Sequence, residues 1–229
     1  MTYVVSNLFG RLERFGKLLD KISFGESDIM YVLGNIVDFG EESVELVTDL
    51  SMRYNVYSVL GEHDYKAYKL LSEFDRILKA KSAPSPEFSS AMIEWSANGG
   101  MATLEAFKEA DEDTKEGFLE YLSELPVFEE AEVKGREFVL VSGGINNFSA
   151  KRDLEDYELE DFIGLTFDLD KTYYKSKSII AGYLGYEFTP AGRAGKINAK
   201  DGNVALACDM SENDEIVCLC LENGREYYV

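Results

Sequence analysis

The chain has 229 residues, with 43 acidic and 23 basic side chains and a formal net charge of −20 at pH 7. This length supports one substantial core, and because no long Pro/Ser-rich linker interrupts the chain, we expect one domain over 1–229. The excess negative charge repels phosphate backbones and anionic lipid headgroups, which argues against nucleic acid and membranes as partners. No basic or long apolar leader follows Met1, so the sequence predicts a cytoplasmic protein.

Three cysteines, Cys208, Cys218 and Cys220, lie in apolar, strand-like runs near the C-terminus. An odd number of cysteines in a chain predicted to be cytoplasmic favours reduced, buried thiols. A site in which three thiolates hold one metal ion is the alternative.

The first 80 residues alternate short β-branched runs with amphipathic segments. Strands are expected at 3–6, 28–33 and 55–60, and helices at 11–22, 41–52 and 65–79. Strands that alternate with helices at this spacing predict a parallel sheet covered on both faces. Ligands of such sheets collect at the carboxyl ends of the strands, so the loops that follow the three strands are the candidate site.

The remainder of the chain is predicted to form a helical segment followed by strands. The stretch 83–86 (APSP) ends the third helix, and helices are expected at 88–97, 101–110 and 113–125. Strands at 127–133 and 137–141 are expected to form a hairpin around Lys134-Gly135, and further strands are expected at 204–208, 215–221 and 225–229. The last three, with a hairpin turn at Asn223-Gly224, are expected to be antiparallel and to close one edge of a second sheet.

The loops at 6–10 (SNLFG), 34–40 (GNIVDFG) and 61–64 (GEHD) follow the three expected strands. They resemble the signature loops D-x-H-G, G-D-x-V-D-R-G and G-N-H-E of the calcineurin-like metallophosphoesterases, and more narrowly the bacterial Ser/Thr phosphoprotein phosphatases. The stretch 95–104 (WSANGGMATL) is similar to that branch's W-x-x-N-G-G-x-x-T-L segment, and 140–145 (LVSGGI) to its L-V-H-A-G-I. The resemblance implies an α/β (α+β) fold, a β-sandwich of two mixed sheets flanked by helices, with a helical insertion at about 84–125.

In that family, two metal ions hold the hydroxide nucleophile and the phosphoryl oxygens, and Asp, Asn and His side chains bind the metals. At none of the aligned ligand positions does this chain have the family's residue. The aligned residues are Asn7, Phe9, Asn35, Glu62, Ser142 and Tyr183. The family's phosphate-binding arginines, which make bidentate bonds to phosphoryl oxygens, align with Phe39 and Thr166.

The chain has one histidine, His63. With Asp38 it matches the Asp-His pair that donates a proton to the leaving group in the family. A carboxylate beside an imidazole orients the ring, which suits a general acid. The alternative is a structural hydrogen-bonded pair that joins two loops.

We expect a former metal pocket that holds no transition metal and is partly filled by the aromatic rings of Phe9, Phe39 and Tyr183. Three interpretations of function remain. The motif losses favour a catalytically inactive phosphatase-like protein, a pseudophosphatase, that binds a protein or a phosphorylated ligand. The second is a residual phosphoesterase, with one weakly bound Mn, Mg or Ca ion held by Glu62, Asn35 and Asn7, or with His63 and Asp38 used in another reaction. The third is a purely structural subunit.

Overall fold

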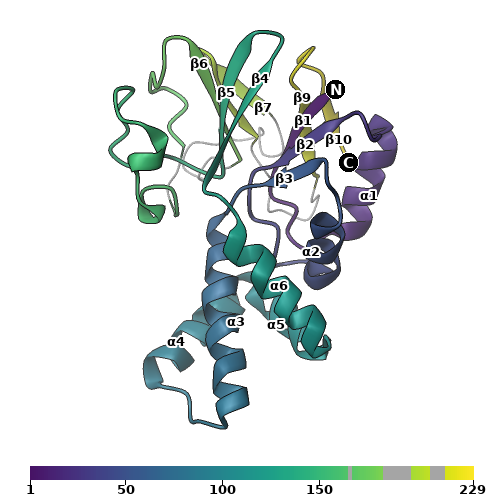
Figure 1. Cartoon of the computed structure of the whole chain (residues 1–229), viewed down its shortest axis with the longest axis vertical. Coiled ribbons are helices and arrows are strands. Elements are labelled where there is room, and N and C mark those ends of the chain that lie inside the picture. Colours follow the sequence, from purple (N-terminus) through teal and green to yellow (C-terminus); the bar gives the residue numbers. More distant parts are fainter. Residues whose placement is uncertain (165–166, 183–196, 207–214) are drawn as a thin grey trace.

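Two mixed β-sheets form the body of the molecule, and helices extend from one end of it (Figure 1). The computed structural model describes residues 1–164, 167–182, 197–206 and 215–229. The expected fold class, two mixed sheets flanked by helices, is confirmed.

The first sheet has the strand order β10-β9-β1-β2-β3. Its strands are β1 (Thr2–Val5), β2 (Ile29–Val32), β3 (Val56–Ser58), β9 (Val217–Cys220) and β10 (Glu226–Tyr228). The strands β1, β2 and β3 pair in parallel, and this places the three candidate loops at one edge of the sheet. The hairpin of β9 and β10 pairs with β1 in antiparallel orientation.

The second sheet has the order β4-β5-β6-β8-β7. Its strands are β4 (Phe128–Val133), β5 (Arg136–Val141), β6 (Lys177–Ala181), β7 (Ile197–Lys200) and β8 (Asn203–Leu206). The hairpin of β4 and β5 is antiparallel as expected, whereas β6 pairs in parallel with both β5 and β8. The outermost strand, β7, is antiparallel to β8.

The C-terminal strands depart from the expectation. They do not all close the second sheet: β8 enters it in parallel with β6, and the β9–β10 hairpin completes the first sheet. Every residue of β9 is buried, which is typical of an interior strand with neighbours on both sides. The free edge of β1 provides that position, and the turn at Asn223-Gly224 forms as predicted, with the Gly224 N–H donating to the Cys220 carbonyl.

Helices follow each strand of the parallel part and then form the insertion. They are α1 (Leu12–Ile22), α2 (Ser43–Ser51), α3 (Glu62–Ala80), α4 (Pro86–Trp95), α5 (Met101–Glu109) and α6 (Glu112–Glu124). The third helix begins at Glu62, three residues before the expected start, and the Asp64 side chain caps it by accepting from the Gly61 N–H at 2.9 Å. In the described part of the chain, no helix is long and apolar enough to cross a membrane.

The buried side chains form three clusters. One fills the space between the sheets, with Val4, Leu140 and Ile180 at its centre. The other two lie on the outer faces of the sheets, one beneath the helices, where Phe15 and Phe107 are fully buried, and one beneath the loops that follow β5. Burial on both faces fixes the strands, so the loops at their ends rest on a rigid base.

Candidate functional site

The three signature loops interlock through their backbones. The Asn7 N–H donates to the Gly34 carbonyl at 3.1 Å, and the Phe9 N–H donates to the Asn35 carbonyl at 3.0 Å. Asn7, Phe9, Asn35, Asp38 and Phe39 all have positive φ, between 46° and 77°. Each such conformation costs a residue with a side chain on the order of 1 kcal/mol, so the surrounding contacts must hold the loops in place.

An amide pair lies at two of the expected metal-ligand positions. The side-chain nitrogen of Asn35 donates to the side-chain oxygen of Asn7 at 2.8 Å. The Asn7 nitrogen donates to the Gly182 carbonyl at 2.5 Å, and the Asn35 oxygen accepts from the His63 backbone N–H at 3.3 Å. Both side chains are buried, and these hydrogen bonds satisfy them without a cation.

Three rings meet at the mouth of the site. The centroids of Phe9 and Phe39 are 5.0 Å apart, and each lies 5.3 Å from the His63 ring. These edge-on and tilted contacts are favourable aromatic geometries. Phe9 and Phe39 therefore fill space at positions where the family has a metal ligand and a phosphate-binding arginine.

The structure brings Asp38 and His63 together, with 2.7 Å between Asp38 Oδ2 and His63 Nδ1. Asp38 is fully buried and also accepts hydrogen bonds from the Trp95 indole and the Thr103 hydroxyl, each at 2.9 Å. The His63 side chain is 22% exposed. The carboxylate thus fixes the imidazole, and two residues of the helical insertion fix the carboxylate.

Asp64 is a buried carboxylate whose role the sequence left open. Its oxygens accept from the backbone N–H groups of Asn35, Ile36, Val37 and Gly61, at 2.7 to 3.2 Å. Burial raises its pKa to about 6, while the N–H donors act in the opposite direction. Its acceptor capacity is used to join the second and third loops.

Of the other residues expected at the metal and phosphate positions, the described ones do not join the amide pair or the three rings. Glu62 is partly exposed and pairs with Lys66 at 2.6 Å, so it does not join the amide pair. Ser142 is buried beside Gly34: a Cβ added to Gly34 would lie 2.7 Å from the Ser142 hydroxyl oxygen. Tyr183 and Thr166 lie outside the described residues, as does Cys208.

These residues do not fit a two-metal centre. Among the described residues, no group of three or more His, Cys, Asp or Glu side chains is placed to hold a metal ion. The carboxylates nearest the loops are already bonded, Asp38 to the insertion and to His63, and Asp64 to the backbone. Of the described side chains in the three loops, the His63 ring can hold or move a proton at Nε2.

Sequence reasoning missed two parts of this arrangement. The acceptor role of Asp64 carried little local signal, because three of its four N–H donors lie 27 to 29 residues away in the chain. The contacts of Trp95 and Thr103 with Asp38 carried no local signal, because they join segments 57 and 65 residues apart.

Part of the chain is similar in sequence to known proteins. Curated relatives are the symmetrical bis(5′-nucleosyl)-tetraphosphatases of Pseudomonas putida, 35% identical over 81 residues, and of Buchnera aphidicola, 40% identical over 65 residues. These matches cover 34% and 28% of this chain, and only 28% and 24% of the relatives, so the chain matches about a quarter of their length.

Solved structures match over the whole chain at low identity. A protein provisionally named a diadenosine tetraphosphatase has a TM-score of 0.63 at 18% identity, with 100% of this chain and 92% of that chain covered. A Ser/Thr phosphatase from Saccharomyces cerevisiae has a TM-score of 0.53 at 13% identity, with 100% and 78% covered. The model of the calcineurin-like phosphoesterase family matches residues 2–182. Since that match spans most of the chain and agrees with the two-sheet fold, the chain belongs to the calcineurin-like phosphoesterase family.

Proposed function

We propose that this chain is a pseudophosphatase, a family member that acts as a metal-free binding or regulatory module for a protein or a phosphorylated ligand. The observation that carries the proposal is the hydrogen bond between Asn7 and Asn35, two positions at which the family has metal-binding aspartates. Two carboxylates in these places would repel each other without cations. Two amides instead offer one donor and one acceptor to each other.

The aromatic cluster supports the same conclusion. Charged side chains bind phosphoryl groups strongly, whereas Phe9 and Phe39 place apolar rings at two of the family's functional positions. Because Phe39 stands where the family has a phosphate-binding arginine, a protein partner is favoured over a phosphorylated ligand.

The test is a calorimetric titration of Mn²⁺ into protein freed of metal with a chelator. We expect only weak, non-saturating binding, from the charge of −20. The Asn7→Asp/Asn35→Asp variant should bind Mn²⁺ more tightly than the parent protein, because it restores two carboxylates. Two tight sites in the parent protein would overturn the proposal.

A second candidate is a phosphoesterase with a rearranged site, and two observations favour it. The Asp38 and His63 side chains keep the geometry of a proton-donor pair, and the curated relatives are named as tetraphosphatases. The insertion motif at 95–104 supports the Ser/Thr phosphatase branch, whereas the relatives support a dinucleoside polyphosphate as substrate. Hydrolysis of diadenosine tetraphosphate or of a phosphopeptide in Mn²⁺, lost in His63→Ala, would establish this candidate.

A further inference from the structure

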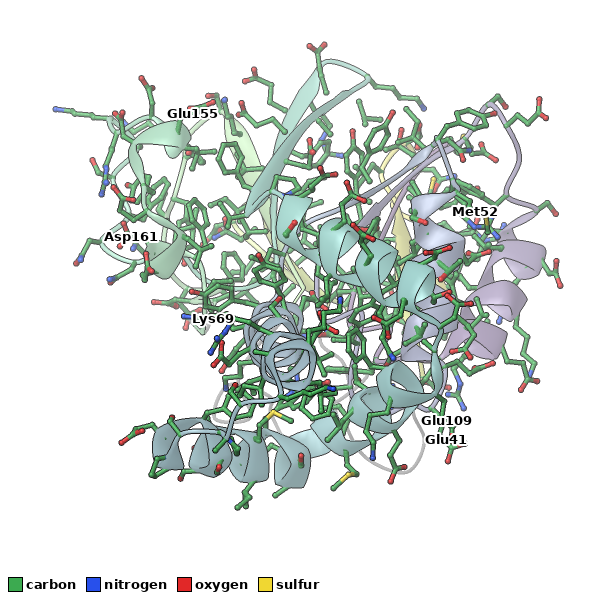
Figure 2. The ribbon with its side chains drawn as sticks, turned by 60° about the horizontal axis from the view of Figure 1, so that its bottom comes forward. Glu41, Met52, Lys69, Glu109, Glu155 and Asp161 are labelled. Atoms are coloured by element: carbon green, nitrogen blue, oxygen red, sulfur yellow. The ribbon has the colours of Figure 1, made fainter. Side chains whose placement is uncertain are left out.

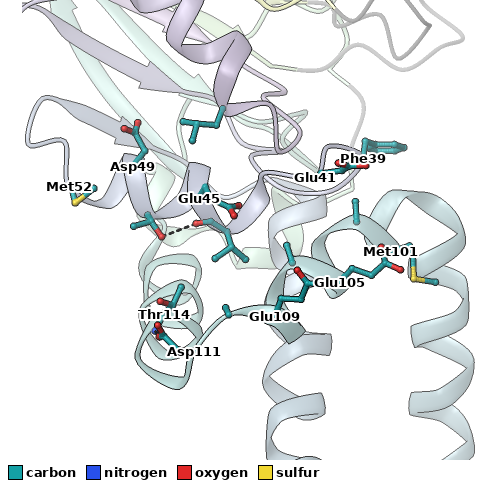
Figure 3. Close-up of a pocket in the computed structure, with 16 residues that line it drawn as sticks. Phe39, Glu41, Glu45, Asp49, Met52, Met101, Glu105, Glu109, Asp111 and Thr114 are labelled. Carbon is teal, nitrogen blue, oxygen red and sulfur yellow. Dashed lines mark hydrogen bonds between the residues drawn. The ribbon is translucent and has the colours of Figure 1, made fainter.

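A groove with a volume of about 1170 Å³ follows the line where α2 packs against α5 and the start of α6 (Figure 3). Glu41, Glu45 and Asp49 occur at intervals of four residues along one wall, and Met101, Glu105 and Glu109 at the same interval along the other. Four residues are about one helical turn, so Glu45 and Asp49 on α2 form one row and the three residues on α5 form another, while Glu41 precedes the start of α2 at Ser43.

The lining combines apolar surface with these acids. Leu12, Val44 and three alanines of α5 and its end contribute apolar atoms. Met52, Met101 and Phe39, at 73%, 47% and 38% exposed, are three of the nine large apolar side chains that the described residues expose. Methionine adapts to irregular partners, and apolar side chains gathered at a groove indicate an interaction surface.

The charge of the groove has one sign. Among the described residues, its lining includes six carboxylates and no Lys, Arg or His. Asp49 pairs with Arg53, which is outside the lining, and Asp111 caps α6 through the Thr114 N–H. The four glutamates, Glu41, Glu45, Glu105 and Glu109, are exposed and have no ion pair within the part of the chain that the structure describes.

We propose that this groove binds a basic amphipathic helix of a partner protein. Its apolar ridge would pack between Met52 and Met101, and its Lys and Arg side chains would pair with the two rows of glutamates. A second copy of this chain is disfavoured, because its net charge of −20 would oppose the carboxylates. An added β-strand is disfavoured because helices form the groove walls and offer no free sheet edge.

The basic helix would be the partner of the binding module proposed above, so the biological role of the groove rests on that proposed function. The groove is distinct from the amide pair and the Asp38–His63 pair, and Phe39 is the one described residue that it shares with the candidate site. Binding at the groove can therefore be measured independently of metal or hydrolysis.

The probe is a fluorescein-labelled peptide of about 18 residues, five helical turns, with leucines on one face and lysines on the other. Anisotropy titrations against the whole chain are done in chelator at physiological ionic strength. We expect saturable binding, weakened at least about tenfold in Glu45→Lys/Glu109→Lys. The matched control, Glu155→Lys/Glu160→Lys, reverses two exposed glutamates; Figure 2 labels Glu155 and Asp161, which directly follows Glu160 in the chain, both far from Glu109. It should change the affinity by less than about twofold.

A second pair of variants tests the apolar part. Met52→Ser should weaken binding about fivefold, whereas Ile93→Ser, an equally exposed apolar residue on α4, should leave it unchanged. Equal effects of the groove and control variants, or no saturable binding of the Leu/Lys peptide, would overturn the inference. If the peptide did not bind, the result of the metal titration would be unaffected. If the protein hydrolysed a substrate in Mn²⁺, the pseudophosphatase proposal would be overturned, but the peptide isotherm would be unchanged.

Discussion

A single buried carboxylate, that of Asp64, connects the second and third signature loops. Four backbone N–H groups donate to its two oxygens, and no solvent reaches the side chain. Unsatisfied buried N–H groups are costly, so Asp64 stabilises loop conformations that contain several left-handed residues.

We expect Asp64→Ala to lower the free energy of unfolding by about 2 kcal/mol or more, because four buried N–H groups lose their acceptor. Urea denaturation at pH 7 measures the change. The matched control is Asp20→Ala on the exposed face of α1, which should change stability by less than about 0.5 kcal/mol. Similar values for the two variants would contradict the role given to Asp64.

The same residue predicts a pH dependence. Burial raises the folded-state pKa of Asp64 to about 6, above the unfolded value of about 3.9. Between these values the folded protein binds more protons than the unfolded chain, so the stability from this group is greatest below about pH 4 and decreases as the pH rises to about 6. The stability difference between the parent protein and Asp64→Ala should therefore narrow, on the order of 2 kcal/mol, from pH 4 to pH 7. If the plots of unfolding free energy against pH for the parent protein and Asp64→Ala were parallel, the raised pKa of Asp64 would be excluded.

At the scale of elements, the joint between α4 and α5 fixes the candidate site. Gly99 has a φ of +101°, and its carbonyl accepts from the Phe39 N–H at 2.9 Å. A Cβ on Gly99 would lie 2.7 Å from the Phe39 ring. The helical insertion therefore sets the positions of both Asp38 and Phe39.

Gly99→Ala should destabilise the protein by about 2 kcal/mol or more, because alanine disfavours this backbone conformation and would collide with the Phe39 ring. Gly117→Ala in α6 is the control: nothing lies within 4 Å of its added Cβ, and alanine favours a helix, so a gain of about 0.5 to 1 kcal/mol is expected. Thermal unfolding followed by the fluorescence of Trp95, the one tryptophan in the chain, distinguishes the two. A Gly99→Ala variant as stable as the parent protein would refute the close packing.

Local sequence patterns predicted most of these helices and strands, but they did not predict which strands pair with each other. The alternation of strands and helices, the insertion and both hairpin turns follow from periodicity and from residues such as Gly135 and Gly224. Which sheet receives β8 or β9 depends on edges that form far away in the sequence. For the candidate site, the substitutions at Asn7 and Asn35 were visible in the sequence, but the acceptor role of Asp64 and the groove beside α2 require the folded chain.

At the scale of the whole molecule, the β9–β10 hairpin lies in the same sheet as the first strand. Cys218 and Cys220 on β9 are fully buried between β1 and β10. Burial raises the pKa of the Cys218 thiol to about 12, so little reactive thiolate is present in the folded state.

In a Cys208→Ser background, we expect Cys218 and Cys220 to react with a thiol reagent only through global unfolding. Labelling should be slow in native buffer and should accelerate with urea in step with the loss of overall structure. A short reduced peptide labelled in parallel gives the intrinsic rate. Rapid labelling in native buffer would show that the hairpin opens separately from the rest of the sheet.

The position of β9 beside β1 also affects the order in which the chain can fold during its synthesis. The strands β1 to β3 leave the ribosome before β9 and β10, so β1 lacks one neighbour until β9 has been translated. During that interval the first sheet has an unpaired edge made of apolar residues, which is a template for mispairing between nascent chains. Translation must therefore reach β9 before β1, the strand that leads into the first signature loop, has a neighbour on both sides.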